Sequence, residues 1–87
     1  MSTADLIRQR LAVLEPETLT LEDESAQHKG HAGAASGGGH FNLTLVSPRF
    51  SNLSTLARHR LVYDAMGELM QREIHALSIT ALSPEEL

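Results

Sequence analysis

Apolar residues near the start of the chain recur at the spacing of a helix. Ser2 or Thr3 can cap this helix, and Asp5 lies in its first turn, where a carboxylate interacts favourably with the helix dipole. Pro16 limits how far the helix can extend. The pattern therefore predicts an N-terminal helix with one apolar face, made of Leu6, Ile7, Leu11 and Leu14.

The period then changes to strict alternation in two segments. Thr18–Glu22 alternates polar and apolar residues and ends in the acidic turn Asp23-Glu24-Ser25, which is typical of a half-buried strand. A second strand is predicted over Phe41–Val46, with Phe41, Leu43 and Leu45 on one face, and Ser47-Pro48 ends it. His40 precedes Phe41 and is predicted to lie on the opposite, exposed or edge face.

The segment between these two strands is rich in glycine. Five of the six glycines lie between Gly30 and Gly39. Glycine loses more backbone entropy on folding than other residues, so this composition disfavours a helix or a central strand. We predict a long flexible loop over residues 26–39, which makes the two strands an open hairpin.

A longer helical period follows from Ser54 to Arg72. Its apolar face comprises Leu61, Val62, Ala65, Met66, Leu69 and Met70. Leu53 and Leu56 are out of phase with this face, which predicts a separate short turn or helix near Asn52. His75–Ala81 alternates again and predicts a third strand, parallel to the strand before the crossover.

Together these elements predict an α+β fold of order α-β-β-α-β. The sheet has three strands in a mixed arrangement, and the helices pack on one face. With 87 residues, 41% of them hydrophobic, the chain is expected to form a single domain over residues 1–87.

Composition narrows the functional classes. A formal charge of −4 with only seven Lys and Arg residues disfavours general binding of polyanions. The sequence contains no nucleophile with a partner base, no paired carboxylates in an apolar setting and no phosphate-binding loop, so no enzymatic activity is predicted. Neither a membrane span nor a secretory signal is present, and a cytoplasmic protein without membrane association is expected.

Histidine is the residue type that suggests a metal site. The chain has five histidines and no cysteine, and His28, His31 and His40 fall close together in or beside the glycine-rich segment. A fourth, His75, begins the last strand. By parity His75 lies on the side of Leu77 and Ile79, but at the rim, where a side chain can emerge from the core. Imidazole suits zinc, copper and iron, whereas iron-sulfur clusters are normally held by cysteine, so any cluster needs sulfur from a partner.

Six blocks of sequence, in order and spacing, resemble the signature of the BolA family. They are Asp23-Glu24-Ser25, His28, Gly39-His40-Phe41, Val46-Ser47-Pro48-Arg49-Phe50, Arg58-His59-Arg60-Leu61-Val62-Tyr63 and His75-Ala76-Leu77. The resemblance covers nearly the whole chain and implies a class II KH-like fold, in agreement with the element order. Glycine is common in this family where the chain has Asn52, and asparagine also tolerates a left-handed turn.

The resemblance also implies a function. BolA-like proteins partner monothiol glutaredoxins in iron-sulfur cluster assembly, trafficking or iron sensing. A heterodimer would share a [2Fe-2S] cluster, completed by glutathione, with mixed sulfur and histidine ligation similar to a Rieske centre. His75 is the implied fixed ligand, and His28 or, alternatively, His31 is the second. The isolated chain is then expected to be a monomer that holds no cluster tightly by itself.

Two other functions are compatible with the residues. A nucleic-acid-binding transcriptional regulator would use Arg49, Arg58 and Arg60. Arg58, however, projects along the apolar face, so it is expected to lie at the end of that face or to form a structural ion pair with a carboxylate such as Asp23 or Glu24. The stretch Arg49–Ser54 lacks the G-x-x-G loop with which KH domains clamp a nucleic-acid backbone, so any DNA binding is expected to be weak. The third possibility is a divalent metal site formed by the loop histidines alone, which would bind weakly because the loop must be ordered.

Overall fold

The computed structural model of the protein describes residues 2–24 and 39–87. The main elements are α1 (Thr3–Leu11), β1 (Thr18–Asp23), β2 (Gly39–Val46), α3 (Thr55–Met66), α4 (Leu69–Arg72) and β3 (Ile74–Leu82). In the described part of the chain, three short 3-10 turns accompany them: η1 (Ala12–Leu14), η3 (Pro48–Phe50) and η4 (Pro84–Glu86). This order confirms the predicted α+β fold. Gly39, which the sequence placed in the loop, begins β2, and the rest of the predicted loop lies outside the described residues.

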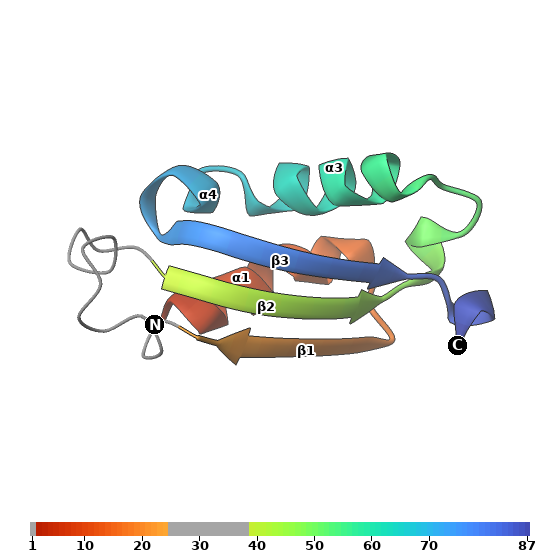
Figure 1. The fold of residues 1–87 in the computed structure, drawn as a ribbon, viewed down its shortest axis with the longest axis horizontal. Helices are drawn as coiled ribbons and strands as arrows, with labels where there is room; N and C mark the ends of the chain where they lie inside the picture. Colours follow the sequence, from red (N-terminus) through yellow and green to blue (C-terminus); the bar gives the residue numbers. More distant parts are fainter. Residues whose placement is uncertain (1, 25–38) are drawn as a thin grey trace.

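The sheet has the strand order β1-β2-β3, with β2 in the centre (Figure 1). β1 and β2 are antiparallel, with Leu21 opposite Leu43, whereas β2 and β3 are parallel, with Leu43 opposite Ile79. The mixed sheet predicted from the sequence is thus confirmed. The parallel pair is joined through α3 and α4, the helical crossover that parallel strands require.

Alternation along β2 divides the sheet into a covered face and an open face. Phe41, Leu43 and Leu45 are buried, whereas His40 and Asn42 are only half-buried. The buried side chains of β2 form one cluster with residues of the helices, the 3-10 turns and β3, namely Ile7, Leu11, Leu14, Phe50, Val62, Met66, Leu69 and Ile74. Helices therefore cover one face of the sheet, and α1 is seen behind the strands in Figure 1.

α1 begins where the sequence predicted. Ser2 is its N-cap: the Ser2 hydroxyl accepts a hydrogen bond from the Asp5 N–H at 3.1 Å, and the Asp5 carboxylate accepts one from the Ser2 N–H at 3.3 Å. This capping box lowers the pKa of Asp5, mainly through the Ser2 hydroxyl, and satisfies donors that the first turn leaves unpaired.

Among the described residues, no helix has the length and apolar character needed to cross a membrane.

The helix predicted over residues 54–72 is interrupted. Gly67 ends α3 with φ 57°, and α4 starts anew at Leu69. Positive φ is easily adopted by glycine, so the chain can turn here without strain. The apolar face continues across the interruption because Met66 and Leu69 are both buried, which is why the periodicity alone indicated one continuous helix.

The predicted turn near Asn52 is confirmed. η3 ends at Phe50, whose side chain is fully buried, and Asn52 follows with φ 65°. Asparagine is among the few residues other than glycine that adopt this left-handed conformation readily. Ser54 then caps α3 by accepting a hydrogen bond from the Ala57 N–H at 3.1 Å.

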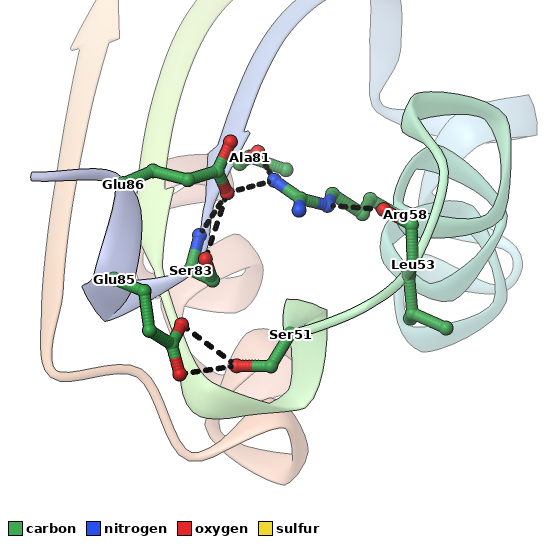
Figure 2. Close-up of polar contacts among 7 residues, drawn as sticks. All are labelled: Ser51, Leu53, Arg58, Ala81, Ser83, Glu85 and Glu86. Carbon is green, nitrogen blue, oxygen red and sulfur yellow. Dashed lines mark hydrogen bonds and ion pairs between the residues drawn. The ribbon is translucent and has the colours of Figure 1, made fainter.

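Arg58 connects α3 to the end of the chain (Figure 2). Its side chain is only 12% exposed and donates to the carbonyl oxygens of Leu53, at 3.0 Å, and Ala81, at 2.9 Å. The guanidinium also forms an ion pair with Glu86. The expected structural ion pair of Arg58 with a carboxylate is therefore confirmed. The carboxylate is that of Glu86 rather than Asp23 or Glu24, the examples that the sequence suggested, because Arg58 extends toward the C-terminal end of β3.

Glu86 is fixed by several donors at once. Its Oε1 accepts hydrogen bonds from the Ser83 N–H and the Ser83 hydroxyl, both at 2.8 Å, as well as from Arg58. These donors, the Ser83 backbone N–H first among them, lower the pKa of Glu86 from an ordinary value of 4.5 to about 2. The neighbouring Glu85 accepts from the Ser51 hydroxyl at 3.0 Å, which links the C-terminal turn to the segment after η3 (Figure 2).

We expect Arg58→Ala to lower the free energy of unfolding by about 2 kcal/mol, because two backbone carbonyls lose a charged donor in a mostly buried position. Arg60→Ala is the matched control, since Arg60 is exposed on the same helix, and it should change stability by less than about 0.5 kcal/mol. Urea denaturation of both variants measures the difference. Equal stabilities would contradict a structural role for Arg58.

The stabilisation by Glu86 should depend on pH. A carboxylate whose pKa is lowered by folding stabilises the folded state above its unfolded pKa, and the stabilisation is lost as the pH falls from about 4.5 toward about 2. Glu86→Gln should therefore be less stable than the unmodified chain at about pH 6, and the difference should shrink toward about pH 2. A difference that is constant across this range would contradict a lowering of the Glu86 pKa by folding.

Candidate metal centre

The position of His75 is set by an irregularity in the sheet. Gly39 lies opposite Ile74, but the next residue of β2, His40, lies opposite Ala76, so β3 contains one extra residue, His75. Such a bulge interrupts the alternation of side chains. Ile74 is buried at 5% exposure, whereas His75 and Ala76 are both exposed.

Strand parity had placed His75 on the side of Leu77 and Ile79, emerging at the rim. The bulge overturns this parity, because Ile74 takes the inward position and His75 turns to the open face. The signal was present in the sequence: Ile74 and Leu77 are both apolar and three residues apart, which a regular strand cannot accommodate on one face. The predicted accessibility of His75 is nevertheless confirmed, since its side chain is exposed.

His75 lies beside His40. The centroids of the two imidazole rings are 5.0 Å apart and their planes are inclined by 37°. His40 is half-buried on the open face of β2, the face opposite Phe41, as the alternation predicted, but β2 is the central strand rather than an edge. The sequence treated His40 as a structural residue and missed this pairing, because the bulge that turns His75 toward it cannot be inferred from strand parity.

Gly39 keeps space for the core beside the bulge. A Cβ atom at this position would overlap the ring of Phe41, which is itself only 4% exposed. The Gly39 N–H donates to the carbonyl of Glu73 at 3.0 Å and so joins β2 to the residue before β3. Gly39 therefore allows Phe41 to pack inward while its neighbour His40 remains on the open face.

The other predicted histidine ligands, His28 and His31, lie outside the described residues. Within residues 2–24 and 39–87, no group of three or more histidine, aspartate or glutamate side chains is arranged to hold a metal ion. The described part of the site therefore consists of two imidazoles on neighbouring strands. Neutral imidazole is a ligand for zinc, copper and iron, so these side chains fit a metal centre whose remaining ligands come from elsewhere.

The three arginines of the nucleic-acid hypothesis are not equivalent. Arg49 forms a 2.7 Å ion pair with Glu15, with both side chains more than half exposed, and such surface pairs contribute little stability. Arg58 is engaged by Glu86 and two carbonyls. Arg60 is exposed on α3. The three arginines therefore do not present equally accessible guanidinium groups.

The sequence and the structure were both compared with those of known proteins, and both comparisons point to the same family. The family described as BolA-like protein matches residues 11–86, nearly the whole chain. The chain belongs to the BolA-like family. Its structure is also similar to the BolA domain of SufE1 from Arabidopsis thaliana, with a TM-score of 0.86 and 42% identity over 100% of this chain and 98% of that domain.

The names of two relatives of this BolA-like chain describe the function or cellular location of those proteins. SufE-like protein 1 of Arabidopsis thaliana, named as chloroplastic and mitochondrial, is 42% identical over 93% of this chain and 24% of its own length. The DNA-binding transcriptional regulator BolA of Haemophilus influenzae is 33% identical over 99% of this chain and 82% of its own length. The chain spans from about a quarter to about half of the first curated relatives it matches.

Gly39→Ala is expected to destabilise the protein by about 1–3 kcal/mol, because the added Cβ displaces a buried aromatic ring. It should also separate His40 from His75, which would weaken the contacts between their ring protons in NMR spectra. Ser78→Ala is the control, because Ser78 is exposed on the regular part of β3. A Gly39→Ala protein as stable as this control would contradict the tight packing of Phe41 on Gly39.

Proposed function

We propose that this BolA-like chain is a non-enzymatic adaptor that partners a monothiol glutaredoxin in iron-sulfur cluster assembly, trafficking or iron sensing. It would contribute histidine ligands to a [2Fe-2S] cluster that is shared with the partner and with glutathione. His75 would be one ligand, and His28 or His31 would be the second. The observation that carries the proposal is an accessible histidine at the start of β3 in a chain that contains no cysteine.

The position of His75 suits a ligand shared between two proteins. A metal centre at a protein interface needs a side chain that projects beyond the backbone yet is fixed in place. The bulge exposes His75, while the buried neighbour Ile74 anchors the strand beneath it. The backbone can thus hold the imidazole in place without covering it, and a partner could approach from the open face of the sheet.

The lack of cysteine defines what the partner must bring. Thiolates hold most iron-sulfur clusters, and histidine replaces cysteine on one of the two irons in Rieske centres. This chain can offer imidazole but no thiolate, so the sulfur ligands would come from the glutaredoxin cysteine and from glutathione. Histidine ligation raises the reduction potential of such a cluster relative to ligation by cysteine alone.

The chain's own residues would bind and orient rather than catalyse. His75 would bind the cluster through a ring nitrogen, and the pairing of β2 with β3 would hold the imidazole in place. Bound in this way, the cluster would serve as cargo or as a signal of iron supply. We also propose that the protein acts in the cytoplasm as a monomer when it is alone.

The proposal predicts that the chain alone does not assemble a cluster. Mixing with a monothiol glutaredoxin, iron, sulfide and glutathione should give a heterodimer that absorbs visible light. His75→Ala should alter the absorption and paramagnetic resonance spectra of this heterodimer, because one nitrogen ligand is lost. His59→Ala is the matched control, since His59 lies on α3, and its spectra should equal those of the unmodified complex.

An unchanged spectrum and unchanged partner affinity in His75→Ala would contradict the ligand assignment. Comparing His28→Ala with His31→Ala in the same assay identifies the second ligand. The histidine whose replacement changes the spectrum is the second ligand. If neither replacement changes the spectrum, neither histidine is a ligand, and the chain's contribution is limited to His75 and other residues.

A second candidate is a DNA-binding transcriptional regulator, which the name of the Haemophilus influenzae relative favours. Of the three arginines, Arg60 is exposed and forms no ion pair with another described residue, whereas Arg49 is exposed but paired with Glu15. The net charge of −4 would repel the negatively charged phosphates of DNA and so lower the affinity. Any binding should therefore be weak and strongly dependent on salt.

If the chain binds DNA in this way, Arg60→Glu should weaken binding and lower the slope of log affinity against log salt concentration by about 1 or more. Arg49→Ala should have a smaller effect in the same direction. Fluorescence anisotropy with a labelled duplex at several salt concentrations measures both quantities. An affinity unchanged by Arg60→Glu rules out this arginine surface as the DNA-binding site.

A further inference from the structure

We infer that His40 and His75 together form a chelating site for a single divalent transition-metal ion, which the chain can bind without a partner. This site differs from the proposed shared cluster because it requires neither glutaredoxin nor sulfide, although both would use His75. It also differs from a site made by the loop histidines, since both ligands lie on strands of the sheet.

The separation of the rings matches a chelating pair. A metal–nitrogen bond to imidazole is about 2.0–2.1 Å, so two imidazoles on adjacent positions of a tetrahedral ion have ring centroids about 5 Å apart. The observed separation of the His40 and His75 centroids is 5.0 Å. The inclination of 37° also departs from parallel stacking, in which the ring nitrogens could not converge on one ion. An ion could thus be bound with little movement of the strands.

The backbone fixes both ligands in advance. His40 lies on the central strand, and its carbonyl accepts a 2.7 Å hydrogen bond from the Glu24 N–H. His75 is the extra residue of the bulge between buried Ile74 and the regular part of β3. Ordering a flexible chain costs roughly 1–2 kcal/mol per residue, and ligands on paired strands avoid most of that cost.

Two acidic residues are backbone neighbours of the pair. Glu24 follows the end of β1 next to His40, and Glu73 immediately precedes β3. Since the described residues supply no third ligand to the imidazoles, the ion would keep open positions for water or for a ligand from another molecule. The expected ions are those that imidazole prefers, Cu²⁺, Ni²⁺, Zn²⁺ and Co²⁺, rather than Mg²⁺ or Ca²⁺.

The test uses the full chain without a histidine tag, titrated in a calorimeter with Ni²⁺, Co²⁺, Zn²⁺ and Mg²⁺ in turn. Because His28 and His31 could bind metal on their own, the reference protein carries His28→Ala and His31→Ala. It should bind one ion per chain, more tightly for Ni²⁺ than for Co²⁺, with no heat from Mg²⁺. Adding His40→Ala or His75→Ala should weaken binding about tenfold or more. Loss of a residue that only hydrogen-bonds to a metal ligand already has an effect of this size, and loss of a ligand should have at least as large an effect.

His59→Ala in the same background is the control and should bind as the reference does. NMR spectra of the imidazole nitrogens should shift for His40 and His75 on addition of Zn²⁺, and not for His59. Equal metal affinity with and without His40 would overturn the inference, as would loss of all binding in the reference protein. Circular dichroism confirms that each variant is folded. Cluster formation with glutaredoxin is measured separately, so failure of either proposal does not imply failure of the other.

Discussion

The central position of β2 is the constraint on which the rest of the structure depends. A strand paired on both sides can expose its side chains only above and below the sheet, so its alternation divides the molecule into a packed face and an open face. Phe41, Leu43 and Leu45 supply the packed face and collect the helices around them. Their neighbour His40 must then lie on the open face. The same alternation that builds the core therefore also places one imidazole of the candidate site.

The bulge in β3 adds the second imidazole. A regular parallel strand would turn His75 toward the helices and leave Ile74 exposed, which would bury a polar ring and lose apolar burial at once. One extra residue resolves both problems, because Ile74 enters the core while His75 joins His40 outside. Gly39 makes this possible on the opposite strand, since any side chain there would displace Phe41. Packing of the core and exposure of the site are thus consequences of a single local irregularity.

Local signals explain which features could be predicted from the sequence. Capping by Ser2, alternation in the strands and the left-handed tolerance of Asn52 all act over a few residues, and all three are found in the structure. The interruption at Gly67 was missed because the apolar face continues through it. The partner of Arg58 was missed because Glu86 lies 28 residues away, and nothing local favours it over Asp23 or Glu24. The pairing of His40 with His75 was missed for the same kind of reason, since it depends on the register between two strands.

The distribution of histidines between strands and the glycine-rich segment bears on how a metal would be shared. His40 and His75 are held by paired strands, so they can bind an ion with little ordering cost, whereas His28 and His31 sit in a sequence whose glycines make ordering expensive. A partner that supplies thiolate and also contacts this segment would offset that entropy cost. A single ion on the strand pair would occupy His75 and so compete with a shared cluster for the same imidazole. Because the chain has no cysteine, it has no thiolate that would favour a cluster over a single ion. Which of the two binds at His75 would therefore depend on the thiolates that the partner supplies.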